Sequence, residues 1–183
     1  MSNPGFTRAD KALERLFDYP VDLDVAVRQL GRSSGVYAWW AGPSVLPGLH
    51  GPVNDMVPDL RMLYLGRATT LRGRIVRNHL RRSGMSTLRR TLAGLMLADG
   101  YRTMWADRVV LVPEDEERLT RWMHANLYLT WAEDPEPNSI EATLVAKLHP
   151  PLNVSGVHPD DLQQPVLDAK VAYDTSAVDP SAP

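Results

Sequence analysis

Two short stretches decide the fold of this chain: SGVYAWW at residues 34–40 and RMLYLG at residues 61–66. Both are rich in aromatic and aliphatic residues, which favours extended strands bounded by turns. Between them, residues 41–60 contain seven Gly and Pro residues, which predict a loop or an insertion. The second stretch is expected to stop at Gly66. The sequence therefore predicts two neighbouring strands joined by an irregular segment.

Most of the other segments show helical periodicity. We expect helices at residues 7–18, 23–30, 69–82, 86–99, 114–124 and 138–148, and further strands at residues 103–112 and 126–133. Thr7 is a candidate cap for the first helix, and Ser86 or Thr87 for the fourth. The expected class is α/β of the α+β type, with a small, mainly antiparallel three-stranded central sheet flanked by helices.

Three parts of the chain differ in composition. Residues 1–31 are expected to form an N-terminal helical extension and residues 32–155 the main domain. Residues 156–183 are rich in Asp, Pro and Ser and contain few apolar anchors, so we expect a flexible tail. The total length of 183 residues suits one domain with appendages.

The composition excludes several kinds of site and location. There is no cysteine, which rules out disulfides, zinc–thiolate sites and cysteine nucleophiles. The chain shows no secretory pattern and no apolar run near the roughly 20 residues of a membrane helix. We therefore expect a soluble cytoplasmic protein without membrane contact. The oligomeric state is not predicted by any feature of the sequence.

The charges are unevenly distributed. The net charge of −2 argues mildly against a nucleic-acid partner, because such proteins are usually basic. Between Arg67 and Arg90, however, there are eight arginines and no acid. The whole chain has 17 arginines and three lysines, and arginine makes planar two-point contacts to phosphate that lysine cannot make. The arginine-rich segment is thus a candidate phosphate-binding surface.

A set of residues in a fixed order carries the strongest functional signal. Gly35-Val36-Tyr37 lies in the first expected strand and Tyr64-Leu65-Gly66 in the second. Arg74 follows Gly66 by eight residues, and Asn153 follows Glu141 by twelve. This ordered set resembles the GIY-YIG nuclease superfamily, which is named for two such tripeptides on neighbouring strands. The resemblance covers residues 35–153 and implies a small fold that cleaves phosphodiester bonds with the help of a metal.

The resemblance implies a role for each catalytic candidate. Glu141 would be the sole protein ligand of a hydrated Mg²⁺ or Mn²⁺, and Arg74 would hold the scissile phosphate. Tyr37 would orient or deprotonate the attacking water, with Tyr64 lining the same pocket. His79 is a candidate proton shuttle. Substrate-binding candidates are Gly66, Arg67, Arg77, Asn78, Arg81 and Asn153.

Structural alternatives stay open for the strand and helix residues. The two tyrosines could simply be packing residues of the strands. Glu141 could form a capping box with Asn138, three residues earlier. Arg74, with Arg77, Asn78 and Arg81, falls on one face of an α-helix and could be a solvated surface.

His79 and Asn153 also have two interpretations. Members of the superfamily often carry a histidine or tyrosine four residues after the arginine, where this chain has Asn78. An offset of one residue turns a helical side chain by about 100°, so His79 could face the core instead of the phosphate. Asn153 follows two prolines and could serve only to stabilise a turn.

The expected activity is that of a divalent-metal-dependent endonuclease on DNA, with RNA as the second choice. One alternative keeps the fold without turnover, as a module that binds nucleic acid or a protein partner. The other is an enzyme of this fold that acts on a small anionic substrate.

Overall fold

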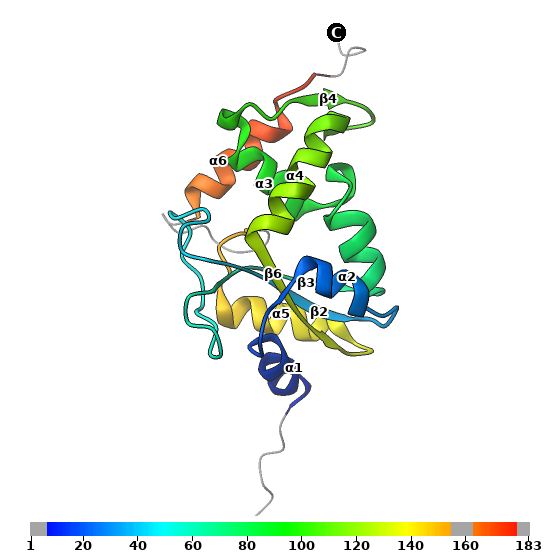
Figure 1. The fold of residues 1–183 in the computed structure, drawn as a ribbon, viewed down its shortest axis with the longest axis vertical. Coiled ribbons are helices and arrows are strands. Elements are labelled where there is room, and N and C mark those ends of the chain that lie inside the picture. The colour runs from blue at the N-terminus through cyan, green and yellow to red at the C-terminus, as the bar shows by residue number, and fades with distance from the viewer. Residues whose placement is uncertain (1–6, 155–162, 179–183) are drawn as a thin grey trace, which may run out of the picture. The chain divides into compact units, whose positions relative to one another are not determined.

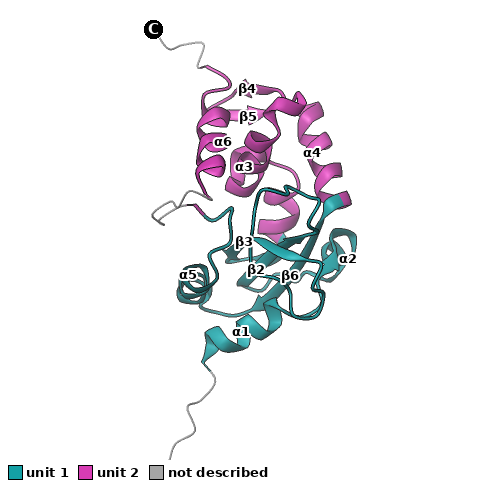
Figure 2. Ribbon diagram, turned by 90° about the vertical axis from the view of Figure 1, so that its left-hand side faces the viewer, with its two compact units in different colours: residues 1–72, 126–153 teal, residues 73–125, 154–183 magenta. Residues whose placement is uncertain are grey.

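The computed structural model describes residues 7–154 and 163–178. Its elements are labelled in Figure 1. The chain divides into two compact units, coloured separately in Figure 2. Unit 1 comprises residues 1–72 and 126–153, and unit 2 comprises residues 73–125 and 154–183. This division differs from the boundaries at residues 31 and 155 expected from composition, which remain a proposal. Each unit is described by itself.

Unit 1 is built on an antiparallel sheet in the order β1-β6-β2-β3. Its strands are β1 (Val21–Asp22), β2 (Gly35–Ala41), β3 (Arg61–Ala68) and β6 (Leu127–Glu133). The α+β class is confirmed. The sheet has four strands instead of three, because the two-residue strand β1 pairs with the outer edge of β6. β3 also continues past Gly66 to Ala68, because its last residues still pair with the start of β2.

Strand β2 is the centre of unit 1, and all of its residues are buried. Val36, Ala38 and Trp40 belong to one core cluster with residues of α1 (Arg8–Leu16) and α5 (Pro137–Leu148). The Trp40 indole N–H donates to Thr130 Oγ1 at 2.8 Å, so its buried polar atom is satisfied. A strand covered on both faces explains the continuous apolar run in the sequence.

The segments around this sheet are fixed by local polar contacts. Thr7 caps α1 and forms a capping box with Asp10, which confirms the expected cap. α2 (Leu23–Gln29) also forms where its helical pattern is expected. The Gly- and Pro-rich segment of residues 41–60 is held by the buried Arg61, whose guanidinium donates to the carbonyl oxygens of Gly42, Val45, Leu46 and Leu49.

Unit 2 is mainly helical. Its elements are the π-helix η1 (Gly73–His79), the 3₁₀ turns η2 (Ser83–Met85) and η3 (Leu97–Asp99), the helices α3 (Thr87–Leu95), α4 (Pro113–Asn126) and α6 (Gln164–Asp174), and the hairpin of β4 (Thr103–Trp105) with β5 (Val109–Leu111). The single strand expected at residues 103–112 is therefore wrong. A turn at residues 106–108 splits it, closed by a hydrogen bond from the Ala106 amide to the Arg108 carbonyl.

The structure also corrects the expectation of a flexible tail for the segment that forms α6. Val166, Ala169 and Tyr173 are buried, and α6 packs against α3. Gly94 on α3 permits the close approach, because a Cβ there would lie 2.2 Å from the Ala169 carbonyl oxygen. Residues 155–162 and 179–183 of the expected tail lie outside the described residues. Across the described parts of the chain, every helix is too short or too polar to cross a bilayer.

Candidate active site

The two tyrosines of the tripeptides lie on the same face of the sheet. Tyr37 pairs with Gly66 across the β2–β3 ladder, and Trp39 pairs with Tyr64. The two tyrosine ring centroids are 6.5 Å apart. Tyr37 is fully buried, whereas Tyr64 is half-buried. The register therefore brings the two candidate tyrosines together.

Gly66 lies directly beneath these rings. A Cβ at this position would lie 2.6 Å from the Tyr37 hydroxyl oxygen and 2.8 Å from Tyr64 Cε1. Contacts this short do not occur between ordinary side chains, so only glycine leaves room for both rings. The glycine in the second tripeptide is thus explained by packing, and its contribution to the site is to let the tyrosines close over the strand.

A second cluster joins β3 to the N-terminal half of α5. Arg67 Nε donates to Glu141 Oε2 at 3.2 Å, and Arg67 Nη1 donates to Asn138 Oδ1 at 2.6 Å. Arg67 pairs with Val36 in the ladder, which places it on the sheet face opposite Tyr37. The Glu141 side chain is 25% exposed. The carboxylate is thus oriented by an arginine and remains accessible to solvent.

The capping alternative for Glu141 is wrong. The N-cap of α5 is Glu136, which makes no side-chain capping bond, and Pro137 occupies the first helical position. Asn138 accepts a hydrogen bond from Arg67. Because proline has no N–H, one of the donors that a cap would satisfy is missing. The first turn of α5 therefore does not depend on Glu141.

Asn153 is bound to the backbone of β3. Its Oδ1 accepts from the Leu65 amide at 2.8 Å, and its Nδ2 donates to the Leu65 carbonyl at 2.7 Å. The side-chain amide therefore replaces the pairing of a neighbouring strand on the free edge of β3. This contact fixes the residue that separates Tyr64 from Gly66, which neither the substrate-binding nor the turn interpretation anticipated.

Arg74 lies in the π-helix η1 of unit 2, not in the α-helix expected at residues 69–82. The Leu80 amide donates to the Ile75 carbonyl at 3.0 Å, which is the five-residue spacing of a π-turn. The α-helical face predicted from Arg74 through Arg81 is therefore wrong in its spacing. Arg74 Nη1 donates to the Met85 carbonyl at 2.9 Å, and the Asn78 carbonyl accepts from the Arg82 amide at 2.9 Å.

His79 is fully buried in the described structure. Its Nδ1 lies 2.6 Å from Ser86 Oγ, which also accepts from the Arg89 amide. Burial lowers the pKa of His79 well below its usual 6.5, and the positive charges of Arg74 and Arg89 lower it further. The imidazole is therefore neutral at physiological pH. This environment matches the core-facing interpretation and not that of an exposed proton shuttle.

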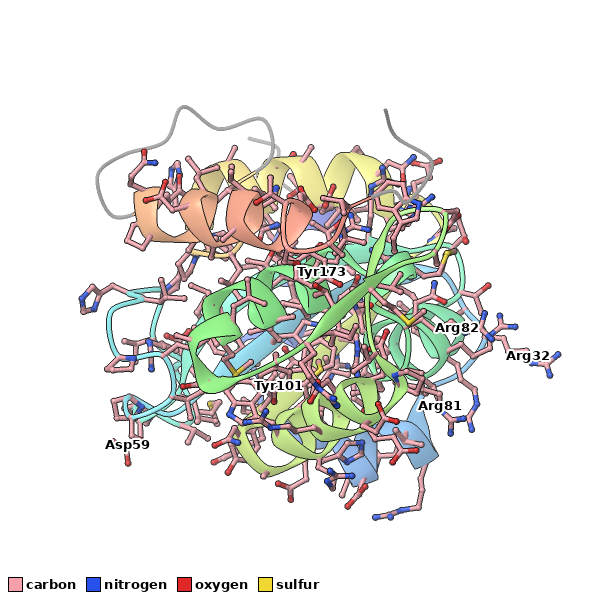
Figure 3. All side chains as sticks on the ribbon, turned by 90° about the horizontal axis from the view of Figure 1, so that it is seen from above. Arg32, Asp59, Arg81, Arg82, Tyr101 and Tyr173 are labelled. Atoms are coloured by element: carbon pink, nitrogen blue, oxygen red, sulfur yellow. The ribbon has the colours of Figure 1, made fainter. Side chains whose placement is uncertain are left out.

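Three arginines between residues 73 and 90 are exposed: Arg77, Arg81 and Arg82. Figure 3 labels Arg81 and Arg82, whose side chains project away from the ribbon. Within residues 7–154 and 163–178, none of the three forms an ion pair with a carboxylate. Like charges at short helical spacing repel one another slightly. An anionic partner would relieve this repulsion.

Sequence reasoning missed Arg89, which is completely buried in unit 2. Its Nε donates to Glu116 Oε2 at 2.6 Å, and its Nη groups donate to the carbonyls of His79 and Glu116 and to Thr120 Oγ1. Burial lowers the pKa of its guanidinium, and Glu116 opposes that shift. The only sign in the sequence that Arg89 is buried is its position among Leu88, Leu92 and other apolar residues of α3. The network organises unit 2 around His79.

The candidate residues fall in both units. Those of unit 1 are Tyr37, Tyr64, Gly66, Arg67, Glu141 and Asn153. Those of unit 2 are Arg74, Arg77, Asn78, His79 and Arg81.

The chemistry of Glu141 suits a hydrated divalent ion. In the part of the chain that the structure describes, no group of three or more Asp, Glu, His or Cys side chains could form a metal cage. Mg²⁺ does not need one, since it keeps several of its waters and uses one or two carboxylates. A solvent-accessible carboxylate oriented by Arg67 fits this mode of binding.

Comparison with known proteins gives one result. The model of the GIY-YIG catalytic domain family matches residues 35–166, which is more than half of the chain. No curated protein and no solved structure gave a match. A GIY-YIG catalytic domain implies nuclease-type hydrolysis of phosphodiester bonds. With both tripeptides, the arginine and the glutamate inside the matched range, this chain belongs to the GIY-YIG catalytic domain family.

Proposed function

We propose that this protein is a divalent-metal-dependent endonuclease that hydrolyses phosphodiester bonds of DNA. The observation that carries the proposal is the state of Glu141. Its carboxylate is oriented by Arg67 at 3.2 Å and is not used to cap α5. A quarter-exposed acid in this position, inside the matched domain, has its ion pair with Arg67 and is still accessible to a metal ion.

Glu141 and Arg67 would hold and neutralise the reacting group. The carboxylate is the proposed ligand of Mg²⁺ or Mn²⁺, and Arg67 keeps it oriented toward solvent. The bound ion would supply Lewis-acid stabilisation of charge on the phosphoryl oxygens. Arg67 also has donors left for a phosphate oxygen, since only its Nε and Nη1 have the partners described above.

Arg74 in unit 2 and the two tyrosines in unit 1 are the other catalytic candidates. Arg74 would hold the scissile phosphate, with its guanidinium oriented by the Met85 carbonyl. Tyr37 would orient or deprotonate the attacking water, and Tyr64 would line the same pocket. Because these rings lie on the sheet face opposite Arg67, the substrate would have to contact both faces at the free edge of β3. Their packing over Gly66 fixes both rings, which is the preorganisation that a reacting water requires.

Two candidates receive positioning roles in this proposal. Asn153 holds Leu65 and thereby the spacing of Tyr64 and Gly66. His79 supports the π-helix that carries Arg74, through its contact with Ser86. Gly66 acts by leaving space, while Arg77, Asn78 and Arg81 remain the candidates for contacts to the nucleic-acid backbone.

The test is incubation of the purified protein with supercoiled plasmid and with single-stranded DNA, in Mg²⁺ or Mn²⁺, beside Glu141→Ala and Arg74→Ala. Metal-dependent nicking that both variants lose would support the proposal. Equal activity of wild type and variants, or none, would contradict it. Binding assays on structured RNA, protein partners and small anions would then separate the module without turnover from the enzyme of a small anion. Both alternatives draw support from the net charge of −2.

A further inference from the structure

Unit 2 exposes a methionine at the tip of a short turn. Met85 ends the 3₁₀ turn η2 and its side chain is 55% exposed. A single exposed apolar residue is ordinary on a protein surface. Met85 differs from an ordinary exposed residue because several arginines contact the backbone of its turn.

Those arginines gather around two adjacent carbonyl oxygens. Arg74 Nη1 donates to the Met85 carbonyl at 2.9 Å, and Arg108 Nη1 donates to the Gly84 carbonyl at 3.2 Å. Arg90 Nη1 lies 3.5 Å from the same Gly84 oxygen. The exposed Arg82 immediately precedes the turn. An apolar side chain thus stands among cationic groups that suit phosphates.

Hydrogen bonds of the buried Ser83 hold the turn η2 in place. The Ser83 amide and hydroxyl both donate to Glu116 Oε1, at 2.7 and 2.6 Å. The Leu111 amide donates to Ser83 Oγ at 2.9 Å, so β5 is tied to the same point. Ser83 itself is fully buried. The backbone that carries Met85 is therefore preorganised, so binding does not have to order the turn itself.

We propose that Met85 is a wedge that contacts the bases next to the scissile phosphate, while the surrounding arginines hold the backbone. The inference rests on the proposed function, because Arg74 links the Met85 carbonyl to the phosphate that it would hold. Proteins that kink DNA insert apolar side chains such as methionine between base steps. The free-energy cost of unstacking is offset by added contacts to the DNA backbone. The partner is thus duplex DNA that contains a weakly stacked step.

A weakly stacked step costs less to open, so the wedge predicts a preference that can be measured. We expect wild type to bind a duplex with one central mismatch about five- to tenfold more tightly than the fully paired duplex of the same sequence. Fluorescence anisotropy in EDTA measures both affinities without cleavage. Met85→Ala should bind the two duplexes equally, and Met85→Leu should keep the preference.

Two further variants separate the wedge from the charge. Met104 on β4 is 43% exposed in the same unit, and Met104→Ala should behave as wild type. Met85→Ala should also keep the slope of log affinity against log salt, because it removes no phosphate contact, whereas Arg81→Ala should reduce that slope by about 0.9.

The outcomes distinguish the wedge from the nuclease proposal. If Met85→Ala keeps the mismatch preference, or if wild type cuts DNA but binds both duplexes equally, the wedge is wrong and the nuclease stands. If wild type neither cuts DNA nor binds it with a steep salt dependence, both proposals fail. A loss of mismatch preference confined to the Met85→Ala variant supports the wedge.

Discussion

The hydroxyl oxygen of Tyr37 lies so close to Gly66 that a Cβ on residue 66 would come within 2.6 Å of it. Tyr37 is fully buried, so its ring cannot swing into solvent to make room. The two tripeptides of the family signature are therefore coupled by packing: the glycine of one makes space for the tyrosine of the other. This relationship leads to the first test.

Replacement of Gly66 by alanine should displace both tyrosine rings. We expect the free energy of unfolding to fall by about 1–3 kcal/mol, as in other overpacked cores. Cleavage should fall by about a hundredfold if the tyrosines position the water, because small displacements of catalytic groups are costly. Chemical denaturation and plasmid nicking measure the two effects. Gly42→Ala is the matched control, because a Cβ there meets nothing within 4 Å and should leave both properties unchanged.

Replacement of Glu141 by glutamine should separate catalysis from stability. The amide keeps the size of the side chain but loses the charge that would bind the metal, so metal-dependent cleavage should fall by about a hundredfold or more. Unfolding free energy should fall by less than about 1 kcal/mol, since Glu141 makes only a partly exposed ion pair with Arg67. Glu117→Gln, at an 80% exposed acid, is the control. If the loss in unfolding free energy equals the loss in cleavage rate expressed as an activation free energy, Glu141 has a structural role instead.

His79 should make the protein less stable in acid. Its folded-state pKa lies well below 6.5 while the unfolded state keeps the usual value, so below about pH 6.5 only the unfolded state takes up this proton. Stability at higher pH is unaffected, and it falls as the pH drops from about 6.5 toward the folded pKa, by at most about 1.4 kcal/mol per pH unit.

The measurement is a set of denaturant titrations between pH 7.5 and 5 for wild type and His79→Asn, in which the amide can still form a hydrogen bond with Ser86. The variant should show a shallower loss of stability in acid. His50→Asn, at an exposed histidine, should retain the wild-type slope. Identical slopes for wild type and His79→Asn would mean that the imidazole titrates in the folded state.

Replacement of Arg89 by alanine should strongly destabilise the protein. The change leaves the carboxylate of Glu116 and several carbonyls without their buried partner, at a cost of about 3–5 kcal/mol. Thermal and denaturant unfolding measure the loss. Arg121→Ala should cost less than about 1 kcal/mol, because Arg121 is 71% exposed and its ion pair with Glu117 is long, at 3.9 Å. A small effect at Arg89 would show that water enters the vacated site.

The sequence by itself determined which parts of the chain form the main elements. The aromatic stretches at residues 34–40 and 61–66 became β2 and β3, and the Thr7 cap started α1. Such features depend on neighbours within a few residues, so local pattern suffices to predict them. The order of the tripeptides, Arg74 and Glu141 likewise pointed to the family before any geometry was known.

Only the tertiary structure decided the features that depend on distant partners. η1 is a π-helix and not the expected α-helix, and His79 at its end lies in a buried contact with Ser86. The hydrogen-bond spacing of a helix depends on the packing around it as well as on its own sequence. The Asn153 amide met Leu65 although 88 residues separate them along the chain. α6 became ordered through its packing on Gly94 of α3. No local pattern encodes these contacts, since each gains its free energy from burying groups that lie far apart in sequence and meet only when the chain is folded.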